Sequence, residues 1–229
     1  MPRLARRVAV GMPHHITQRG NYRQKVFKEP EDFKKYLIWI KEYSEKYELG
    51  IVGYCLMNNH VHFIVTPKKE DSMAKTFNMS HMRYAQYANK KKKARGHLWQ
   101  GRFYSSIMDD EHMIEAMRYV ERNPVRAKMV KKAWDWEWSS AREHTGKGKS
   151  DLPLVERQVL KKVRDGDWKS YILEKDDKEF VEVLRKRTAM GRPFVKESVL
   201  KKLEKLFDVV LGAKDPRGHS NPPANFGFY

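Results

Sequence analysis

Residues 51–67 read IVGYCLMNNHVHFIVTP and have the pattern of a β-hairpin. Two apolar runs, residues 51–57 and 60–66, flank Asn58 and Asn59, a pair that favours a tight turn. The segment therefore predicts two adjacent antiparallel strands, and the fold has to be built around them.

The second strand of this hairpin carries two histidines, His60 and His62, on either side of Val61. Because strand side chains alternate between faces, both imidazoles project from one side while Val61 points into the packing. Two neutral imidazoles at this spacing can converge on one divalent metal ion. A pair of this kind is more often an accident of surface composition, so the interpretation depends on other residues.

Strand and helix patterns also occur around the hairpin, in residues 14–19 (strand), 30–47 (helix), 73–87 (helix), 103–108 (strand) and 109–122 (helix). Pro124 should end the last helix, because the residue before a proline is pushed out of helical conformation. The order β-α-β-β-α-β-α fits an α+β fold of the ferredoxin-like type, an antiparallel sheet with helices packed on one side of it.

Residues 146–150 read GKGKS and are the best candidate for a linker. We therefore expect one unit in residues 1–145 and a basic, mainly helical C-terminal extension in residues 146–229, with a flexible tail from residue 214. The apolar residues of the extension include an amphipathic stripe formed by Leu200, Leu203, Leu206, Phe207 and Val210.

The composition indicates the kind of partner. The chain has 229 residues, with 47 Lys and Arg against 29 Asp and Glu, a net charge of +18. Nucleic acid is the first candidate, because each cation that meets a phosphate releases condensed counterions. The single cysteine, Cys55, excludes a disulfide framework and a cysteine-based zinc site. The sequence contains no run of about 18 apolar residues that could span a bilayer, so we expect a cytoplasmic protein.

A tyrosine on the last predicted helix, Tyr119, lies among arginines in the sequence RYVERNPVR, residues 118–126. Asn123 follows four residues later and shares its helix face. The arginines could hold a phosphate beside the hydroxyl group. The alternative is a packing role, since Met117 and Val120 show that this helix also packs.

A histidine pair on a strand followed by a tyrosine on a later helix resembles the HUH single-tyrosine transposases. These are the IS200/IS605-like group, above all the members associated with repeated palindromic elements. HITQRGN at residues 15–21 resembles the first strand of the family, LWQGRF at residues 98–103 the lead-in to its fourth strand, and residues 118–127 its tyrosine helix. The match extends in order and spacing over residues 13–142.

The resemblance implies a role for each site residue in residues 1–145, which would be the catalytic domain. His60 and His62, with Asn123, would hold Mg²⁺ or Mn²⁺, which polarises the scissile phosphate. Tyr119 would attack the phosphorus and form a 5′-phosphotyrosine link that a 3′-hydroxyl can reverse. The best-known insertion-sequence members have glutamine where this chain has Asn123, so direct ligation by the shorter side chain is left open.

The resemblance also implies single-stranded DNA that is folded as a hairpin beside the cut. Cations can follow its phosphates, and aromatic rings can stack on its unpaired bases. The residues assigned to this surface are Arg19, Arg83, Lys90, Lys91, Lys92, Lys93, Arg95, Trp99, Arg102, Arg118, Arg122 and Arg126. The lysine run is equally well explained as a solvated helix end, and Tyr84 is better explained as a core residue.

Other interpretations are left open. The fold could be a catalytically silent module that binds hairpin DNA or RNA, or a metal-dependent nuclease that uses water instead of Tyr119. Members of the family act as homodimers or as monomers, so the oligomeric state is open too. His14 and His15 are rival metal ligands, but strand neighbours face opposite ways, so at most one could join the site, and we expect neither to do so.

Overall fold

The computed structural model describes residues 7–211, apart from the side chains of residues 164–166. The predicted order of the first seven elements is confirmed: β1 (His14–Arg19), α1 (Pro30–Lys46), β2 (Leu49–Met57), β3 (His60–Pro67), α2 (Ser72–Lys92), β4 (Tyr104–Ile107) and α3 (Asp110–Glu121). The remaining α-helices are α4 (Asn123–Arg126), α5 (Ala141–His144), α6 (Gln158–Leu173), α7 (Lys178–Met190) and α8 (Glu197–Phe207), and two short 3-10 helices, η1 (Asn21–Arg23) and η2 (Ala133–Asp135), lie after β1 and after α4. The tail that we expect to be flexible lies outside the described residues.

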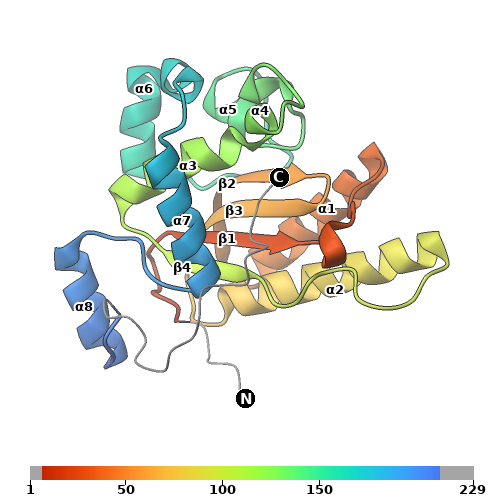
Figure 1. Cartoon of the computed structure of the whole chain (residues 1–229), viewed down its shortest axis with the longest axis horizontal. Helices are drawn as coiled ribbons and strands as arrows, with labels where there is room; N and C mark the ends of the chain where they lie inside the picture. The colour runs from red at the N-terminus through yellow and green to blue at the C-terminus, as the bar shows by residue number, and fades with distance from the viewer. Residues whose placement is uncertain (1–6, 212–229) are drawn as a thin grey trace.

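The strands form one antiparallel, four-stranded sheet in the order β2-β3-β1-β4 (Figure 1). The predicted hairpin pairs β2 with β3 and places Met57 opposite His60. Its register shifts between Ile51 and Gly53, as at a β-bulge. The α+β, ferredoxin-like prediction is confirmed.

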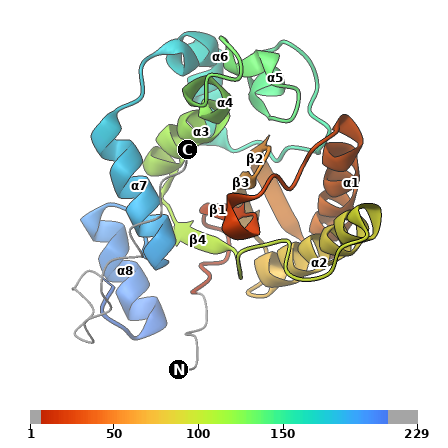
Figure 2. The same ribbon diagram turned by 45° about the vertical axis from the view of Figure 1, so that its right-hand side comes forward.

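Helices cover both faces of the sheet, whereas we expected them on one side only. α1 and α2 pack on one face and α3 on the other (Figure 2). The strands explain the difference, because β2 and β3 are buried at nearly every position. Leaving either face uncovered would therefore have exposed side chains that both strands bury.

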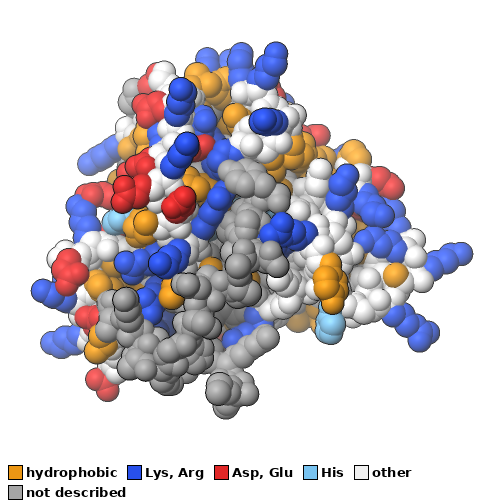
Figure 3. All heavy atoms as spheres, in the orientation of Figure 1, with side chains coloured by type: hydrophobic (Ala, Val, Ile, Leu, Met, Phe, Trp, Pro, Cys, Tyr) orange, Lys and Arg blue, Asp and Glu red, His pale blue; other side chains and the backbone are white. Residues whose placement is uncertain are grey.

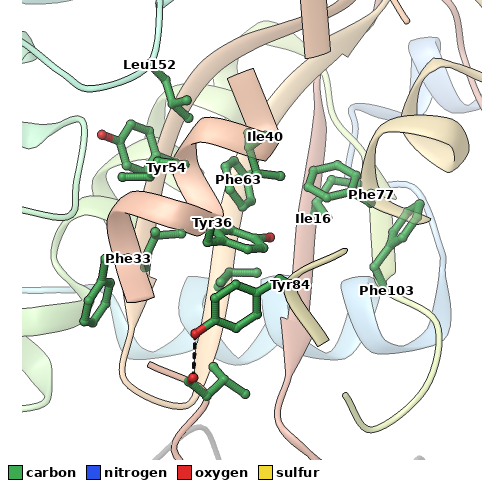
Figure 4. Packing of buried hydrophobic residues seen from close by; sticks show 14 of the residues in the cluster. Ile16, Phe33, Tyr36, Ile40, Tyr54, Phe63, Phe77, Tyr84, Phe103 and Leu152 are labelled. Atoms are coloured by element: carbon green, nitrogen blue, oxygen red, sulfur yellow. Dashed lines mark hydrogen bonds between the residues drawn. The ribbon is translucent and has the colours of Figure 1, made fainter. Parts of the chain in front are cut away.

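The face under α1 and α2 holds a dense aromatic core (Figure 4). Phe63 of β3 lies 5.3 Å from Phe77 of α2 between ring centroids. Tyr84 is fully buried and donates a hydrogen bond to the Val26 carbonyl oxygen at 2.7 Å, so the core role expected for it is confirmed. Val61 points into this core, as strand alternation predicted.

On the opposite face, α3 begins as predicted at its N-cap Asp109, whose side chain accepts a hydrogen bond from His112 N at 3.1 Å. The helix ends at Glu121, slightly earlier than expected, and Pro124 lies in the first turn of α4. Proline is tolerated there because no backbone N–H is needed in a first turn. Gly53 of β2 allows close approach, since a Cβ at this position would overlap the Sδ and Cε atoms of Met117.

The C-terminal segment begins after the mostly exposed residues 146–150 and is mainly helical, as expected. Trp168 of α6 and Leu184 of α7 are buried in the same cluster as residues of α3. The predicted stripe on α8 is only partly packed, because Leu203 is buried whereas Leu206 and Val210 are exposed. The division of the chain at residue 145 stays a prediction. Among residues 7–211, every helix is too short or too polar to cross a bilayer.

Candidate active site

The two histidines of β3 and the tyrosine of α3 lie together between the sheet and the helix. The ring centroids of His60 and His62 are 5.0 Å apart and the rings are nearly perpendicular, at 87°. The centroid of the Tyr119 ring lies 5.6 Å from that of His62, at an interplanar angle of 88°. All three side chains are buried. Strand alternation and the return of α3 across the sheet therefore place a phenol beside an imidazole pair.

Both imidazoles of the pair are held in the neutral form. Burial lowers the pKa of His60 to about 3, and the positive charges of Arg19, Arg126 and Arg185 act in the same direction. Burial also lowers the pKa of His62 well below its usual value, and the neighbouring His60 adds to the effect. A neutral imidazole has a nitrogen lone pair, which is what a metal ion requires of this ligand.

The Nδ1 atom of each ring is held by a neighbour. His60 Nδ1 lies 2.6 Å from Asn59 Oδ1, and His62 Nδ1 lies 2.9 Å from His15 Nε2. In both rings Nε2 is buried and is not used in these contacts. Metal-binding histidines are usually fixed in this way, through the nitrogen that does not face the metal. The donor set therefore fits a divalent cation.

Asn123 lies at the edge of this cluster and is buried. Its Nδ2 atom donates to the backbone oxygens of Tyr119 at 3.2 Å and Val120 at 3.1 Å, so the amide oxygen is the end that can serve as a ligand. Asn123 and His60 line the same pocket, which has a volume of about 290 Å³. The cations in its wall are Arg19, Arg23 and Lys25, so the pocket is suited to an anion such as a phosphate.

Two arginines contact Tyr119. The Arg126 guanidinium lies 4.1 Å from the ring centroid, and Arg185 Nε donates to the hydroxyl oxygen at 3.2 Å. Arg126 also lies 3.3 Å from Asp176 Oδ1, in the connection between α6 and α7. The other two arginines predicted beside the tyrosine are also paired with this connection, Arg118 with Glu174 and Arg122 with Asp176. Their assignment to DNA stays a prediction.

The remaining predicted DNA contacts lie on α2 and on the segment that follows it. Lys and Arg side chains project from the C-terminal end of α2 (Figure 3). In this part of the helix and in the segment that follows it, the exposed cations are Lys90, Lys91, Lys93, Arg95 and Arg102, whereas Lys92 is half-buried. Arg83 pairs with Glu42 at 3.0 Å.

Trp99 occupies a different environment from these cations. It is 8% exposed, and its indole donates to the His81 backbone oxygen at 3.1 Å. This burial argues against the base-stacking role that we assigned to it. Tyr22, which sequence reasoning missed, is 95% exposed beside the pocket residue Arg23, and an exposed ring in such a place can stack on a base.

His15 is a correction to the sequence analysis, which expected neither it nor His14 at the site. The His15 ring lies edge to edge with that of His62, with centroids 5.2 Å apart, an interplanar angle of 5° and a distance of 2.9 Å between His15 Nε2 and His62 Nδ1. In the strand register Thr17 pairs with His62, so His15 is the diagonal neighbour of His62 on the same face. The β1–β3 register is the signal that would have revealed it.

A buried carboxylate holds the tyrosine helix in place. Glu121 is fully buried and accepts hydrogen bonds from Ser140 Oγ at 2.6 Å and from Trp168 Nε1 at 3.0 Å. Its Oε1 atom also lies 2.5 Å from His144 Nδ1. These partners come from outside α3, so the network joins α3 to α5 and α6 two residues away from Tyr119.

Comparison with known proteins gives a consistent result. A family model described as IS200-like transposase matches residues 9–123, about half of the chain. A Haemophilus influenzae protein whose name assigns it to the REP-associated tyrosine transposases is 24% identical over 111 residues, which span 44% of this chain and 63% of that protein. The match thus covers less than two thirds of that relative. A solved REP-associated tyrosine transposase bound to a REP hairpin has the same fold, with a TM-score of 0.55 and 17% identity over 69% of this chain and 96% of that chain.

Proposed function

Because this chain belongs to the IS200-like transposase family, we propose that it is a metal-dependent endonuclease and strand transferase that cuts single-stranded DNA beside a hairpin. The observation that carries the proposal is the position of Tyr119, whose ring lies 5.6 Å from that of His62. A nucleophile and a pair of neutral imidazoles are the parts that such a reaction needs.

His60 and His62 would hold the metal through Nε2, and Asn123 would add its amide oxygen. Imidazole nitrogen suits Mn²⁺ better than Mg²⁺, which prefers oxygen ligands, so this donor set favours Mn²⁺ of the two ions. When bound, the metal polarises the phosphate and offsets the charge that gathers on its oxygens.

Tyr119 would attack the phosphorus, so that a phosphorus–oxygen bond to the phenol forms and the bond to the 3′-oxygen breaks. The products are a 5′-phosphotyrosine and a free 3′-hydroxyl, and a second strand's 3′-hydroxyl can reverse the step and join the DNA. Arg126 and Arg185 offset negative charge on the phenolic oxygen. The hydroxyl is buried, so DNA can reach it only after the site opens.

Hairpin DNA is the proposed substrate for two reasons. The chain has a net charge of +18, and Arg19, Arg23 and Lys25 line the pocket next to His60. In addition, the solved relative with the same fold is bound to a REP hairpin. The pocket could hold a phosphate that flanks the cut while the cations of α2 follow the paired stem.

The test is a covalent adduct between the protein and labelled hairpin DNA with a single-stranded flank. Incubation with Mn²⁺ followed by a denaturing gel should show the adduct for the natural chain and none for Tyr119→Phe. Tyr84→Phe is the matched control, because it removes a buried tyrosine hydroxyl from the opposite face of the sheet.

Three other outcomes would contradict the proposal. An undiminished adduct in Tyr119→Phe would exclude Tyr119 as the nucleophile. DNA cleavage without attached protein would indicate a nuclease that uses water. Binding of the hairpin with no cleavage would indicate the alternative function, a catalytically silent binding module derived from this fold.

A further inference from the structure

Helix α7 belongs to the C-terminal extension and yet lies against β4 and β1, on the side of the sheet that carries α3 (Figures 1 and 2). Arg185 and Thr188 are three residues apart and share one face of this helix. Arg185 Nε donates to the Tyr119 hydroxyl oxygen at 3.2 Å, and Thr188 Oγ1 lies 2.8 Å from His15 Nδ1. One helix face thus contacts both Tyr119 and the His15–His62 pair of the candidate site.

We propose that α7 is an integral part of the active site: Thr188, acting through His15, fixes the orientation of the metal ligand His62, and Arg185 holds the attacking oxygen of Tyr119. This inference rests on the proposed function. It assigns a role to a segment beyond the residues 9–123 that the family model matches.

The direction of the hydrogen bonds follows from the ligand role of His62. If Nε2 of His62 faces the metal, its proton is on Nδ1, which then donates to His15 Nε2 over 2.9 Å. His15 must in turn carry its proton on Nδ1 and donate it to Thr188 Oγ1. The opposite direction would place a proton on His62 Nε2 and block metal binding. The threonine oxygen is therefore the acceptor that ends the chain.

The geometry of this chain leaves little freedom to its members. His15, His62 and Thr188 are all nearly fully buried. The rings of His15 and His62 are parallel within 5° and their centroids lie 5.2 Å apart, as expected when the hydrogen bond between them lies in the plane of both rings. An imidazole whose Nδ1 is held by such an in-plane hydrogen bond presents Nε2 in one direction, which is the condition for a preformed metal site.

Both ends of α7 are attached to the sheet unit, so the helix is placed firmly enough to position other groups. Before α7, Asp176 lies 3.1 Å from Arg122 and 3.3 Å from Arg126. After it, Ser106 Oγ of β4 donates to the Arg192 backbone oxygen at 2.7 Å, and Phe194 N donates to the Ile107 backbone oxygen at 2.7 Å.

The first experiment is a titration of the full chain with Mn²⁺ alone, with free Mn²⁺ measured by electron paramagnetic resonance. Thr188→Val keeps the shape and removes the acceptor, so it should weaken Mn²⁺ binding about tenfold. Thr188→Ser keeps the hydroxyl and should restore the affinity. Thr76→Val removes a buried hydroxyl bonded to the Tyr43 backbone oxygen on the other face, so it should bind as the natural chain does. Circular dichroism at each titration confirms that the variants are folded.

Equal Mn²⁺ affinities for the natural chain, Thr188→Val and Thr76→Val would overturn the inference. So would a natural chain that binds no Mn²⁺, since His62 would then have no ligand role. A loss that Thr188→Ser fails to restore would indicate a packing effect and would also count against it.

The second experiment measures the rate of adduct formation with the hairpin DNA. Arg185→Gln should slow the reaction about tenfold or more, while Arg187→Gln, on the same helix and bonded to the Pro193 backbone oxygen, should leave it unchanged. If the natural chain forms no adduct, the proposed function fails, and the Mn²⁺ titration still decides the role of Thr188. If the natural chain, Arg185→Gln and Arg187→Gln all form the adduct at the same rate, the role inferred for Arg185 fails and the proposed function stands.

Discussion

On β3, Val61 and Phe63 point toward α1 and α2, whereas His60 and His62 point toward α3 and Tyr119. The first face is filled by apolar and aromatic side chains, and its contribution is to stability (Figure 4). The second face buries a polar cluster, whose members hydrogen bond to one another and to helices from far along the chain. The alternation of a single strand thus separates a packing face from the face that carries the candidate site, and changes on neighbouring residues should have different consequences.

The largest effect should come from the packing face. Phe63→Ala removes a fully buried ring that contacts Phe77 and Tyr54, so the free energy of unfolding should fall by about 3–5 kcal/mol. Urea unfolding at neutral pH measures it. A loss below about 1 kcal/mol would show that the aromatic packing on this face of β3 contributes little to the free energy of unfolding.

The next effect tests the chemical face one residue away. His62→Gln should weaken Mn²⁺ binding at least about 100-fold, because an amide replaces an imidazole ligand. Ile64→Val is the matched control on the same face of β3: it should cost about 1 kcal/mol of stability and leave Mn²⁺ binding unchanged. An unaltered Mn²⁺ affinity in His62→Gln would exclude His62 as a metal ligand and would contradict a metal site on this face of β3.

A smaller effect concerns His14, which lies on β1 on the packing face with Ile16. Its Nδ1 donates to the Met12 backbone oxygen at 2.9 Å, and burial lowers its pKa from 6.5 to about 4. Between these values the unfolded chain binds more protons than the folded one, so the free energy of unfolding falls as the pH drops below about 6.5.

The fall contributed by His14 should amount to about 2 kcal/mol at pH 5 and should be absent in His14→Gln. Urea unfolding at pH 7 and pH 5 measures it. The same substitution at the exposed His97 should leave the pH dependence as it is in the natural chain. An identical pH dependence in His14→Gln would show that protonation of His14 does not cause the loss of stability at pH 5.

The smallest effect on stability should come from Arg83, a partly exposed residue of α2 that pairs with the exposed Glu42 at 3.0 Å. Arg83→Gln should cost less than about 1 kcal/mol, as is usual for an exposed ion pair. If Arg83 also contacts a phosphate, the slope of log affinity against log salt should become less negative by about 0.7–0.9 for hairpin DNA in Arg83→Gln. Glu42→Gln breaks the same pair but keeps the cation, so its slope should stay as in the natural chain.

The difference between the faces also explains what could be predicted from the sequence. The periodicity of residues 51–67 and their neighbours predicted the four strands and the three long helices α1, α2 and α3, and the alternation of His60, Val61 and His62 assigned their faces correctly. Coverage of both faces was missed, although the continuous apolar run in residues 51–57 was the signal for a strand buried on both sides.

The missing site residues depend on contacts between distant parts of the chain. His15 requires the register of β1 against β3, and Thr188 is 173 residues away from the histidine that it contacts. Arg185 is followed by Lys186 and Arg187, so the sequence alone does not distinguish it from the other cations of its helix. Trp99 shows the opposite error, because a basic flanking sequence suggested exposure where the ring fills the core.

Gly53 of β2 leaves room for a side chain of α3. A Cβ at this position would overlap Met117 Sδ and come within 2.9 Å of Ser140 Oγ, so a larger residue would force these side chains to move. Met117 lies two residues before Tyr119 on α3. A replacement of Gly53 on the edge strand β2 would therefore have to be accommodated by repacking of the helix that carries Tyr119.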